Sequence, residues 1–261
     1  MEFAGSEILR KYLLKLKFLS CGSQGSCFVD LDKKYVYKIF NSYLADDENP
    51  YFSYEDIMKF SNVKNGTFIW PLDVIKVNGM IVGYILPFKN AKDIFSLSPL
   101  SISLNSLKDY VTCSYNDIKI LSKNNVKIYD LMYNLLLGDD GLYVIDTLEY
   151  SYGRISIWDN QSTLDFALKR FIVDGFFDNV VFEDKTLEDM YFDKYCSFIC
   201  FADAFSKRLS SHIGKAIDYL SDASSLCIPS SKKCIRTWKK DFSIFELCGR
   251  IVTIEEWYKW L

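Results

Sequence analysis

The chain has 261 residues, of which 49% are hydrophobic and 25% charged, the balance of a globular protein with one large domain or two lobes. Its net charge of −3 gives no general attraction to nucleic acid or to anionic membranes. No apolar run approaches the roughly 20 residues that span a bilayer, and Lys15 and Lys17 interrupt the apolar stretch near the N-terminus. These features favour a cytoplasmic protein that does not enter a membrane.

The eight cysteines and the single histidine, His212, form no recognisable metal-binding motif. No two cysteines make a Cys-x-x-Cys pair, so a zinc site is not expected. We expect reduced thiols that pack among other side chains. Cys196 and Cys200 lie one helical turn apart, and a redox pair is the alternative for them.

The first ninety residues are rich in strand signals. Strands are predicted at residues 17–19, 27–29, 35–40, 68–75 and 80–86. Asn78-Gly79, between the last two strands, is a strong hairpin signal. Residues 41–50 are polar and acidic and are predicted as a loop, whereas residues 54–60 are predicted as a helix with Ser53 as its N-cap.

Beyond Pro87 the apolar residues follow helical spacing. Helices are predicted at residues 104–124, 162–174, 187–205, 206–221 and 240–261, with two short strands around the turn at 138–141. A β-rich beginning followed by a mainly helical remainder indicates an α+β protein with two lobes. We expect residues 1–90 to form a small β-rich N-lobe and residues 91–261 a helical C-lobe.

Two glycines and a lysine in the first lobe form a candidate phosphate site. Gly22 and Gly25 lie in a predicted turn between strands, where glycine lets backbone approach a ligand closely. Lys38 follows thirteen residues after Gly25, inside the apolar run Tyr35–Phe40. Burial of an ammonium group is costly unless it is paired, so Lys38 is either a phosphate-binding lysine or an edge lysine that reaches solvent.

Three polar residues in the second lobe form a candidate metal and acceptor site. Asp130 and Asn134 are four residues apart, just before an apolar strand. Asp146 follows the next apolar strand, twelve residues after Asn134. Carboxylate and amide oxygens are ligands for magnesium, and a carboxylate can orient a reacting hydroxyl.

Taken together, these segments resemble the protein kinase-like superfamily, in a bilobal protein kinase-like fold. The glycine turn is similar to the family's G-x-G-x-x-G-x-V, with Ser20 and Cys27 replacing the first glycine and the valine. The run Asp130-Leu131 to Asn134 is similar to the family's catalytic loop but is one residue shorter, and Ile128 and Tyr129 stand where histidine and arginine are usual. Thr147-Leu148 replaces the Phe-Gly that normally follows the metal-binding aspartate.

The resemblance implies a role for each of these residues. Lys38 would hold ATP phosphates and pair with Glu55 in the predicted helix, with Asp56 as the fallback. Asp130 would orient the acceptor hydroxyl. Leu86 would lie at the back of the adenine pocket, while Phe88 and its neighbours would supply backbone contacts. The glycine turn would cover the phosphates, and Asn134 and Asp146 would hold magnesium.

The function that the resemblance implies is an ATP- and magnesium-dependent phosphotransferase, specifically an atypical protein Ser/Thr kinase. A pseudokinase that serves as a nucleotide-binding or protein-interaction module is one alternative. A small-molecule kinase is another, for which an acidic cleft would be lined by Asp174, Asp178, Glu183 and Asp184. A protein substrate or protein partner is expected in the leading case. Basic residues surround Trp238, but the acidic whole favours a solvated face or a partner contact over nucleic acid.

Overall fold

The computed structural model describes residues 1–22, 24–44, 52–132, 134–227, 244–247 and 250–253. The chain divides into two compact units. The first comprises Met1–Asn62, Ile69–Lys89 and Asp241–Leu261, and the second comprises Val63–Phe68 and Asn90–Lys240. Among the described residues, no helix is both long enough and apolar enough to cross a membrane.

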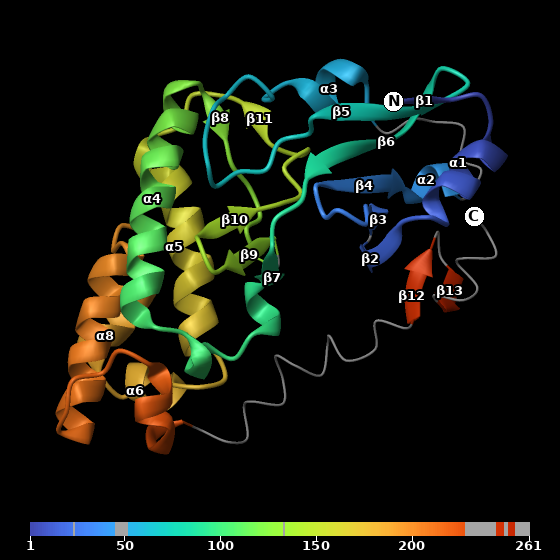
Figure 1. Ribbon diagram of the computed structural model, residues 1–261. Helices are drawn as coiled ribbons and strands as arrows, with labels where there is room; N and C mark the ends of the chain where they lie inside the picture. The colour runs from blue at the N-terminus through green and yellow to red at the C-terminus, as the bar shows by residue number, and fades with distance from the viewer. Residues whose placement is uncertain (23, 45–51, 133, 228–243, 248–249, 254–261) are drawn as a thin grey trace. The chain divides into compact units, whose positions relative to one another are not determined.

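The first unit is built on a six-stranded sheet in the order β1-β5-β6-β4-β3-β2 (Figure 1). Its strands are β1 (Glu2–Phe3), β2 (Lys17–Cys21), β3 (Gly25–Val29), β4 (Tyr35–Phe40), β5 (Asp73–Val77) and β6 (Met80–Pro87). Only β1 runs parallel to its neighbour, β5. Asn78 and Gly79 both have positive φ in the β5–β6 turn, as a tight hairpin requires. The predicted hairpin is therefore confirmed.

Short helices accompany the sheet of the first unit. Helix α1 (Ser6–Leu13) contributes Leu9 and Leu13 to a core that includes Phe28, Ile39 and Ile75 from the sheet. Helix α3 (Tyr54–Met58) begins at a capping box, in which the Ser53 side chain accepts a hydrogen bond from the Asp56 amide and the Asp56 side chain accepts one from the Ser53 amide. The predicted N-cap is confirmed.

Two local predictions in the first ninety residues were wrong. Asn41–Leu44 forms a helix, α2, where a loop was predicted; its first residues are polar but buried, so their composition was misleading. The strand predicted from residue 68 begins only at Asp73. Phe68 instead forms an isolated parallel bridge with Val144, and the Val144 amide donates to the Thr67 carbonyl over 2.8 Å.

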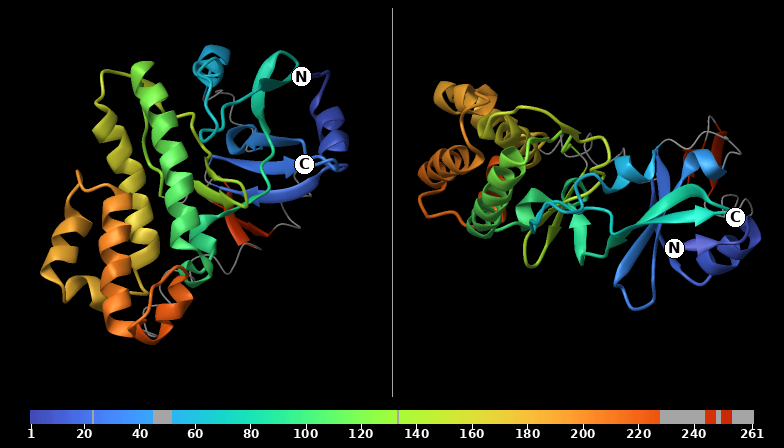
Figure 2. Two further views of the ribbon diagram at one scale, coloured as in Figure 1. Left: turned by 60° about the vertical axis from the view of Figure 1, so that its left-hand side comes forward. Right: turned by 90° about the horizontal axis from the view of Figure 1, so that it is seen from above.

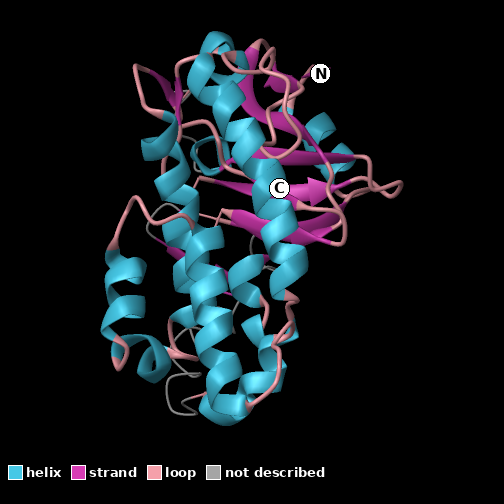
Figure 3. Ribbon diagram, turned by 90° about the vertical axis from the view of Figure 1, so that its left-hand side faces the viewer, coloured by secondary structure: helices cyan, strands magenta, loops and turns pink. Residues whose placement is uncertain are grey.

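The second unit is mainly helical. Its helices are α4 (Leu104–Lys123), α5 (Ile157–Val173), α6 (Asp178–Phe182), α7 (Lys185–Phe192) and α8 (Phe198–Ile213), with 3-10 turns at Ile94–Ser96, Pro99–Ser101 and Leu220–Leu226. Its strands are β7 (Ala91–Asp93), β8 (Val126–Lys127), β9 (Leu135–Gly138), β10 (Leu142–Val144) and β11 (Ser151–Tyr152). Helices α4, α5 and α8 pack against one another (Figures 2 and 3). A sheet-based unit followed by a mainly helical one confirms the predicted α+β arrangement.

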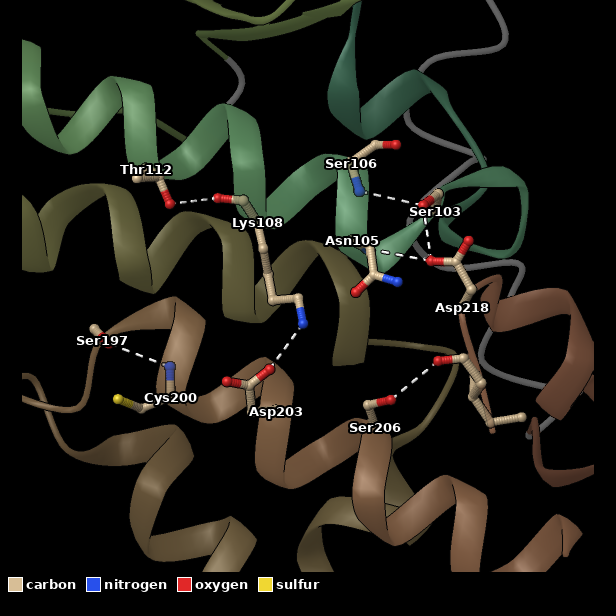
Figure 4. Close-up of polar contacts among 11 residues, drawn as sticks. Ser103, Asn105, Ser106, Lys108, Thr112, Ser197, Cys200, Asp203, Ser206 and Asp218 are labelled. Atoms are coloured by element: carbon tan, nitrogen blue, oxygen red, sulfur yellow. Dashed lines mark hydrogen bonds and ion pairs between the residues drawn. The ribbon is translucent and has the colours of Figure 1, made fainter. Parts of the chain in front are cut away.

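Polar contacts link α4 and α5 to α8 and to the segment that follows α8. Lys108 of α4 forms an ion pair with Asp203 of α8 over 2.8 Å (Figure 4). Ser103, the N-cap of α4, donates from its hydroxyl to Asp218 over 2.8 Å. At the other end, the buried Asp165 of α5 accepts hydrogen bonds from the Tyr115 hydroxyl and from the Phe198 amide. Burial raises the pKa of Asp165 to about 6.

The C-terminal half contains the largest errors of the sequence-based prediction. The helix predicted at 187–205 is interrupted between Phe192 and Phe198, and the helix predicted at 206–221 is the second half of α8, which ends at Ile213. The helix predicted at 240–261 is wrong where the chain is described, because Ile244–Leu247 and Arg250–Thr253 form an antiparallel hairpin, β12–β13. The basic cluster around Trp238 lies outside the described residues.

Candidate functional site

Lys38 is buried near the middle of the sheet in the first unit. Its strand, β4, lies between β3 and β6, so Lys38 is not an edge lysine. Its register partners are Cys27 on β3 and Tyr84 on β6. The side chain is 8% exposed, and its Nζ lies 5.8 Å from the centroid of the Tyr84 ring. The ring face stabilises the ammonium charge in part.

The two glycines of the turn before Lys38 have different surroundings. The Gly22 amide donates to the Gly25 carbonyl over 2.9 Å, and the Asn41 side chain donates to the Gly22 carbonyl over 2.9 Å. A Cβ atom on Gly25 would lie 2.5 Å from the carbonyl oxygen of Ile39, whereas one on Gly22 would meet nothing within 4 Å. Gly25 is therefore required for strand packing, and Gly22 is the glycine whose open side remains for a ligand.

We expect Gly25→Ala to lower the free energy of unfolding by about 2 to 3 kcal/mol without any ligand, because the new methyl group meets backbone. Gly22→Ala is the matched control and should change stability by less than about 1 kcal/mol. Urea unfolding of both variants measures the difference. Equal stability of the two variants would contradict the packing role of Gly25.

Glu55, the predicted partner of Lys38, lies exposed in the first turn of α3. In the described part of the chain, no ion pair or hydrogen bond joins it to Lys38. Asp56, the fallback, is part of the capping box, where its hydrogen bonds with Ser53 lower its pKa. The structure thus places neither carboxylate against the lysine, and the pairing stays a prediction.

Leu86 and Phe88 lie at the end of β6. Leu86 is buried opposite Val36 of β4. The Phe88 amide donates to the Lys34 carbonyl over 2.8 Å. The Phe88 N–H is therefore already used in a hydrogen bond. Of its backbone groups, only the carbonyl oxygen remains for the contact predicted with adenine.

Asp130 and Asn134 are joined in one turn of the second unit. The Asn134 side-chain nitrogen donates to the Asp130 carbonyl over 2.9 Å, and the Asn134 carbonyl accepts from the Ile145 amide over 3.0 Å. Asp130 and Asp146 both have positive φ, of 36° and 59°. Non-glycine residues adopt this conformation at an energetic cost, and such strain is concentrated at functional sites.

Asp130 and Asp146 both affect the pKa of one buried hydroxyl, that of Tyr150. Tyr150 is only 2% exposed, and its ring packs edge-on against Phe68 with centroids 6.2 Å apart. Burial, and then the carboxylates of Asp146 and Asp130, raise the pKa of Tyr150 well above its usual range. Both carboxylates therefore lie within electrostatic range of the same group. Hydrogen bonds thus join Asn134 to Asp130 and to Ile145, the residue before Asp146.

The sequence analysis missed Asn160, which fixes the segment before Asp130. Asn160 is fully buried on α5. Its side-chain oxygen accepts from the Ile128 amide over 3.0 Å, while its nitrogen donates to the Val126 carbonyl and the Ser122 hydroxyl over 2.8 and 2.9 Å. The available signal was a polar residue one turn before Leu164 on the apolar face of a helix.

The segment after Asp146 is short. Only Thr147–Ser156 separate Asp146 from the start of α5, and within this segment β11 pairs with β8, the strand before Asp130. The Gly153 amide donates to the Asn125 carbonyl over 2.8 Å. The segment before Asp130 and the segment after Asp146 are therefore held to each other by backbone hydrogen bonds.

Asn134 and Asp146 carry side-chain oxygens of the kind that magnesium binds together with phosphate and water. Because the Asn134 nitrogen donates to Asp130, its Oδ1 is the atom left to act as a ligand. Magnesium prefers oxygen ligands and keeps several waters. Within the described residues there is no cluster of three or more His, Cys, Asp or Glu side chains that could hold a metal alone. A nucleotide would have to complete the coordination.

Three of the four acidic residues considered for a small-molecule cleft make structural contacts, and no such contact is recorded for the side chain of the fourth, Glu183, within the described residues. Asp174 pairs with Arg170 over 2.6 Å and accepts from the Tyr191 hydroxyl. Asp184 caps α7 and pairs with Arg208 over 3.2 Å. Asp178 accepts from the Gly175 amide over 3.0 Å. These contacts indicate that the acidic side chains stabilise the fold, and they do not favour a role in lining an open substrate cleft.

No protein-family model and no curated protein matches the sequence. Among solved structures, the chain is similar to the crystal structure of the Mycobacterium tuberculosis PknI kinase domain, at 12% sequence identity and a TM-score of 0.46. The similarity covers 75% of this chain and 96% of that domain.

Proposed function

We propose that the protein is an ATP- and magnesium-dependent phosphotransferase that acts on serine or threonine hydroxyls of a protein. The observation that carries the proposal is the grouping of Asp130, Asn134 and Asp146 around one turn, with hydrogen bonds that join the backbone of all three segments. A hydroxyl-orienting carboxylate and magnesium ligands are recurring parts of sites that transfer phosphoryl groups.

In this proposal each unit contributes a separate part of the chemistry. In the first unit, the Lys38 ammonium would bind phosphate oxygens, and the absence of a side chain at Gly22 would let a phosphate group come close to the turn. In the second unit, the Asn134 Oδ1 and the Asp146 carboxylate would hold magnesium, which neutralises phosphate charge.

Asp130 would act on the acceptor. Its carboxylate is exposed, so an incoming hydroxyl can donate a hydrogen bond to it. The carboxylate would orient the hydroxyl oxygen and accept its proton as the new P–O bond forms. The hydrogen bond from Asn134 to the Asp130 carbonyl holds the backbone that carries this side chain.

A pseudokinase is the second candidate, and one observation favours it. Glu55 is exposed and, among the described residues, forms no ion pair with Lys38. A lysine that is oriented by some group other than that glutamate departs from the arrangement that binds phosphates in the family the sequence resembles. Such a protein would bind nucleotide and transfer phosphate slowly or not at all.

Transfer of radiolabelled phosphate from ATP to a mixed library of serine and threonine peptides separates the two candidates. The phosphotransferase predicts magnesium-dependent labelling of peptides. Stabilisation by ATP without labelling would identify the pseudokinase. If ATP neither stabilises the protein nor labels a peptide, both candidate functions are contradicted.

A further inference from the structure

Three side chains next to Asp130 form a polar cluster, here called the Lys127 cluster. The Tyr129 hydroxyl lies 3.0 Å from the Ser151 Oγ, and the Lys127 Nζ lies 4.9 Å from the centroid of the Tyr129 ring. Tyr129 is 36% exposed, and Lys127 and Ser151 are half-buried. The cluster therefore presents an ammonium group and two hydroxyls to solvent.

Backbone pairing fixes these side chains on one face. Ser151 is the register partner of Lys127 in the β8–β11 ladder, and Tyr129 follows Lys127 by two residues. Side chains at paired positions project to the same face of a ladder. Asn160 holds the backbone of Val126 and Ile128 on either side of Lys127. The cluster is thus preorganised and does not depend on a mobile loop.

The charge of the cluster suits an anion. No carboxylate pairs with Lys127 within the residues that the structure describes. The hydrogen bond with Ser151 and the nearby Lys127 lower the pKa of Tyr129, which is the effect expected of an electropositive site. A carboxylate placed here would receive an ion pair from Lys127 and a hydrogen bond from the one hydroxyl of the Tyr129–Ser151 pair that does not donate to the other.

We propose that the Lys127 cluster binds an acidic side chain of the acceptor peptide, close to the hydroxyl that Asp130 orients. This inference rests on the proposed phosphotransferase function and names its substrate class. Asp130 follows Tyr129 directly in the chain, and residues two apart in an extended peptide are separated by about 6.6 Å. A glutamate one or two positions from the acceptor residue is the acidic residue expected to reach the cluster.

A peptide suits this surface better than a small metabolite. Small molecules are generally bound in concave sites that cover most of their surface. The Lys127 cluster instead lies on a two-stranded ladder, β8–β11, with the Tyr129 side chain 36% exposed. An extended chain can lie along such a surface with its side chains in contact.

Binding of two fluorescein-labelled peptides tests the inference without requiring turnover. One peptide carries a central serine flanked by glutamates, and the other has glutamines at the same positions. At low salt we expect the native protein to bind the glutamate peptide about fivefold more tightly, the upper end for one exposed ion pair. Fluorescence anisotropy gives both affinities. The preference should fall at high salt, which screens exposed charges.

Three variants make the test specific. Lys127→Ala should abolish the preference, and Lys127→Arg should keep it. Lys207→Ala removes the same charge from an exposed position on α8 and should leave the preference unchanged. Equal binding of both peptides to the native protein, or a preference that survives in Lys127→Ala, would overturn the inference.

The proposed phosphotransferase function is tested separately, by magnesium-dependent stabilisation with ATP. Stabilisation without any preference for the glutamate peptide rejects the acidic-acceptor inference alone. A preference for the glutamate peptide without stabilisation supports the anion site and rejects phosphotransfer.

Discussion

Asn160→Ala is expected to lower the thermal unfolding midpoint by roughly 10 °C. The substitution removes three buried hydrogen bonds and leaves the Ile128 amide and the Val126 carbonyl without their partner. A buried polar group that loses its partner costs about 1 to 3 kcal/mol, so the total is about 3 to 5 kcal/mol. For a chain of this size each kcal/mol shifts the midpoint by about 2 to 4 °C. Differential scanning calorimetry measures the change.

Asn160→Asp is the matched control, because it keeps a group that can accept from the Ile128 amide but removes both donors. Its midpoint should lie between those of the native protein and Asn160→Ala. An unchanged midpoint in Asn160→Ala would contradict the role assigned to this side chain in holding the segment before Asp130.

Asp146→Asn is expected to lower the rate of phosphate transfer by about two to three orders of magnitude, the range found when one preorganised group is removed from an active site. The amide is nearly isosteric with the carboxylate but carries no charge for magnesium. The fold should be retained, because Asp146 is only half-buried. Transfer of radiolabelled phosphate measures the rate, and circular dichroism checks the fold.

Asp139→Asn is the control for Asp146→Asn. Asp139 is exposed in the turn between β9 and β10, and its backbone carbonyl, rather than its side chain, accepts from Tyr110. The same change of charge there should leave transfer unchanged. Equal losses in both variants would show that net charge, and not a metal ligand, accounts for the effect.

Local patterns were sufficient to predict most strands of the sheet in the first unit, whereas the roles of the second-unit residues stay predictions. Three predicted elements depend only on neighbours in sequence, and all three are present in the structure. They are the strand in the apolar run around Lys38, the Asn78-Gly79 hairpin and the helix at residues 104–124. Asp130, Asn134 and Asp146 were placed at strand ends by the same reasoning. In the structure, hydrogen bonds that sequence spacing alone does not specify join Asn134 to Asp130 and to Ile145, the residue before Asp146.

The features that were missed depend on contacts distant in sequence. Asn160 bonds to backbone more than thirty residues earlier, and in the sequence it is only one polar residue in a helix. Phe68 reads as part of a strand, but it pairs with Val144. The segment at 240–261 was misread because short apolar runs fit helical and strand spacing alike. β-Branched residues such as Ile251, Val252 and Thr253 were the signal for strands.

The most direct test of the proposed function is the thermal unfolding midpoint with ATP, measured with and without magnesium. A ligand at a hundred times its dissociation constant stabilises the fold by about 2.7 kcal/mol, or roughly 5 to 10 °C for a chain of this size. The proposal predicts a magnesium-dependent rise for the native protein that Asp146→Asn loses. A native protein whose midpoint does not respond to ATP and magnesium, or an Asp146→Asn variant that keeps the full response, would contradict it.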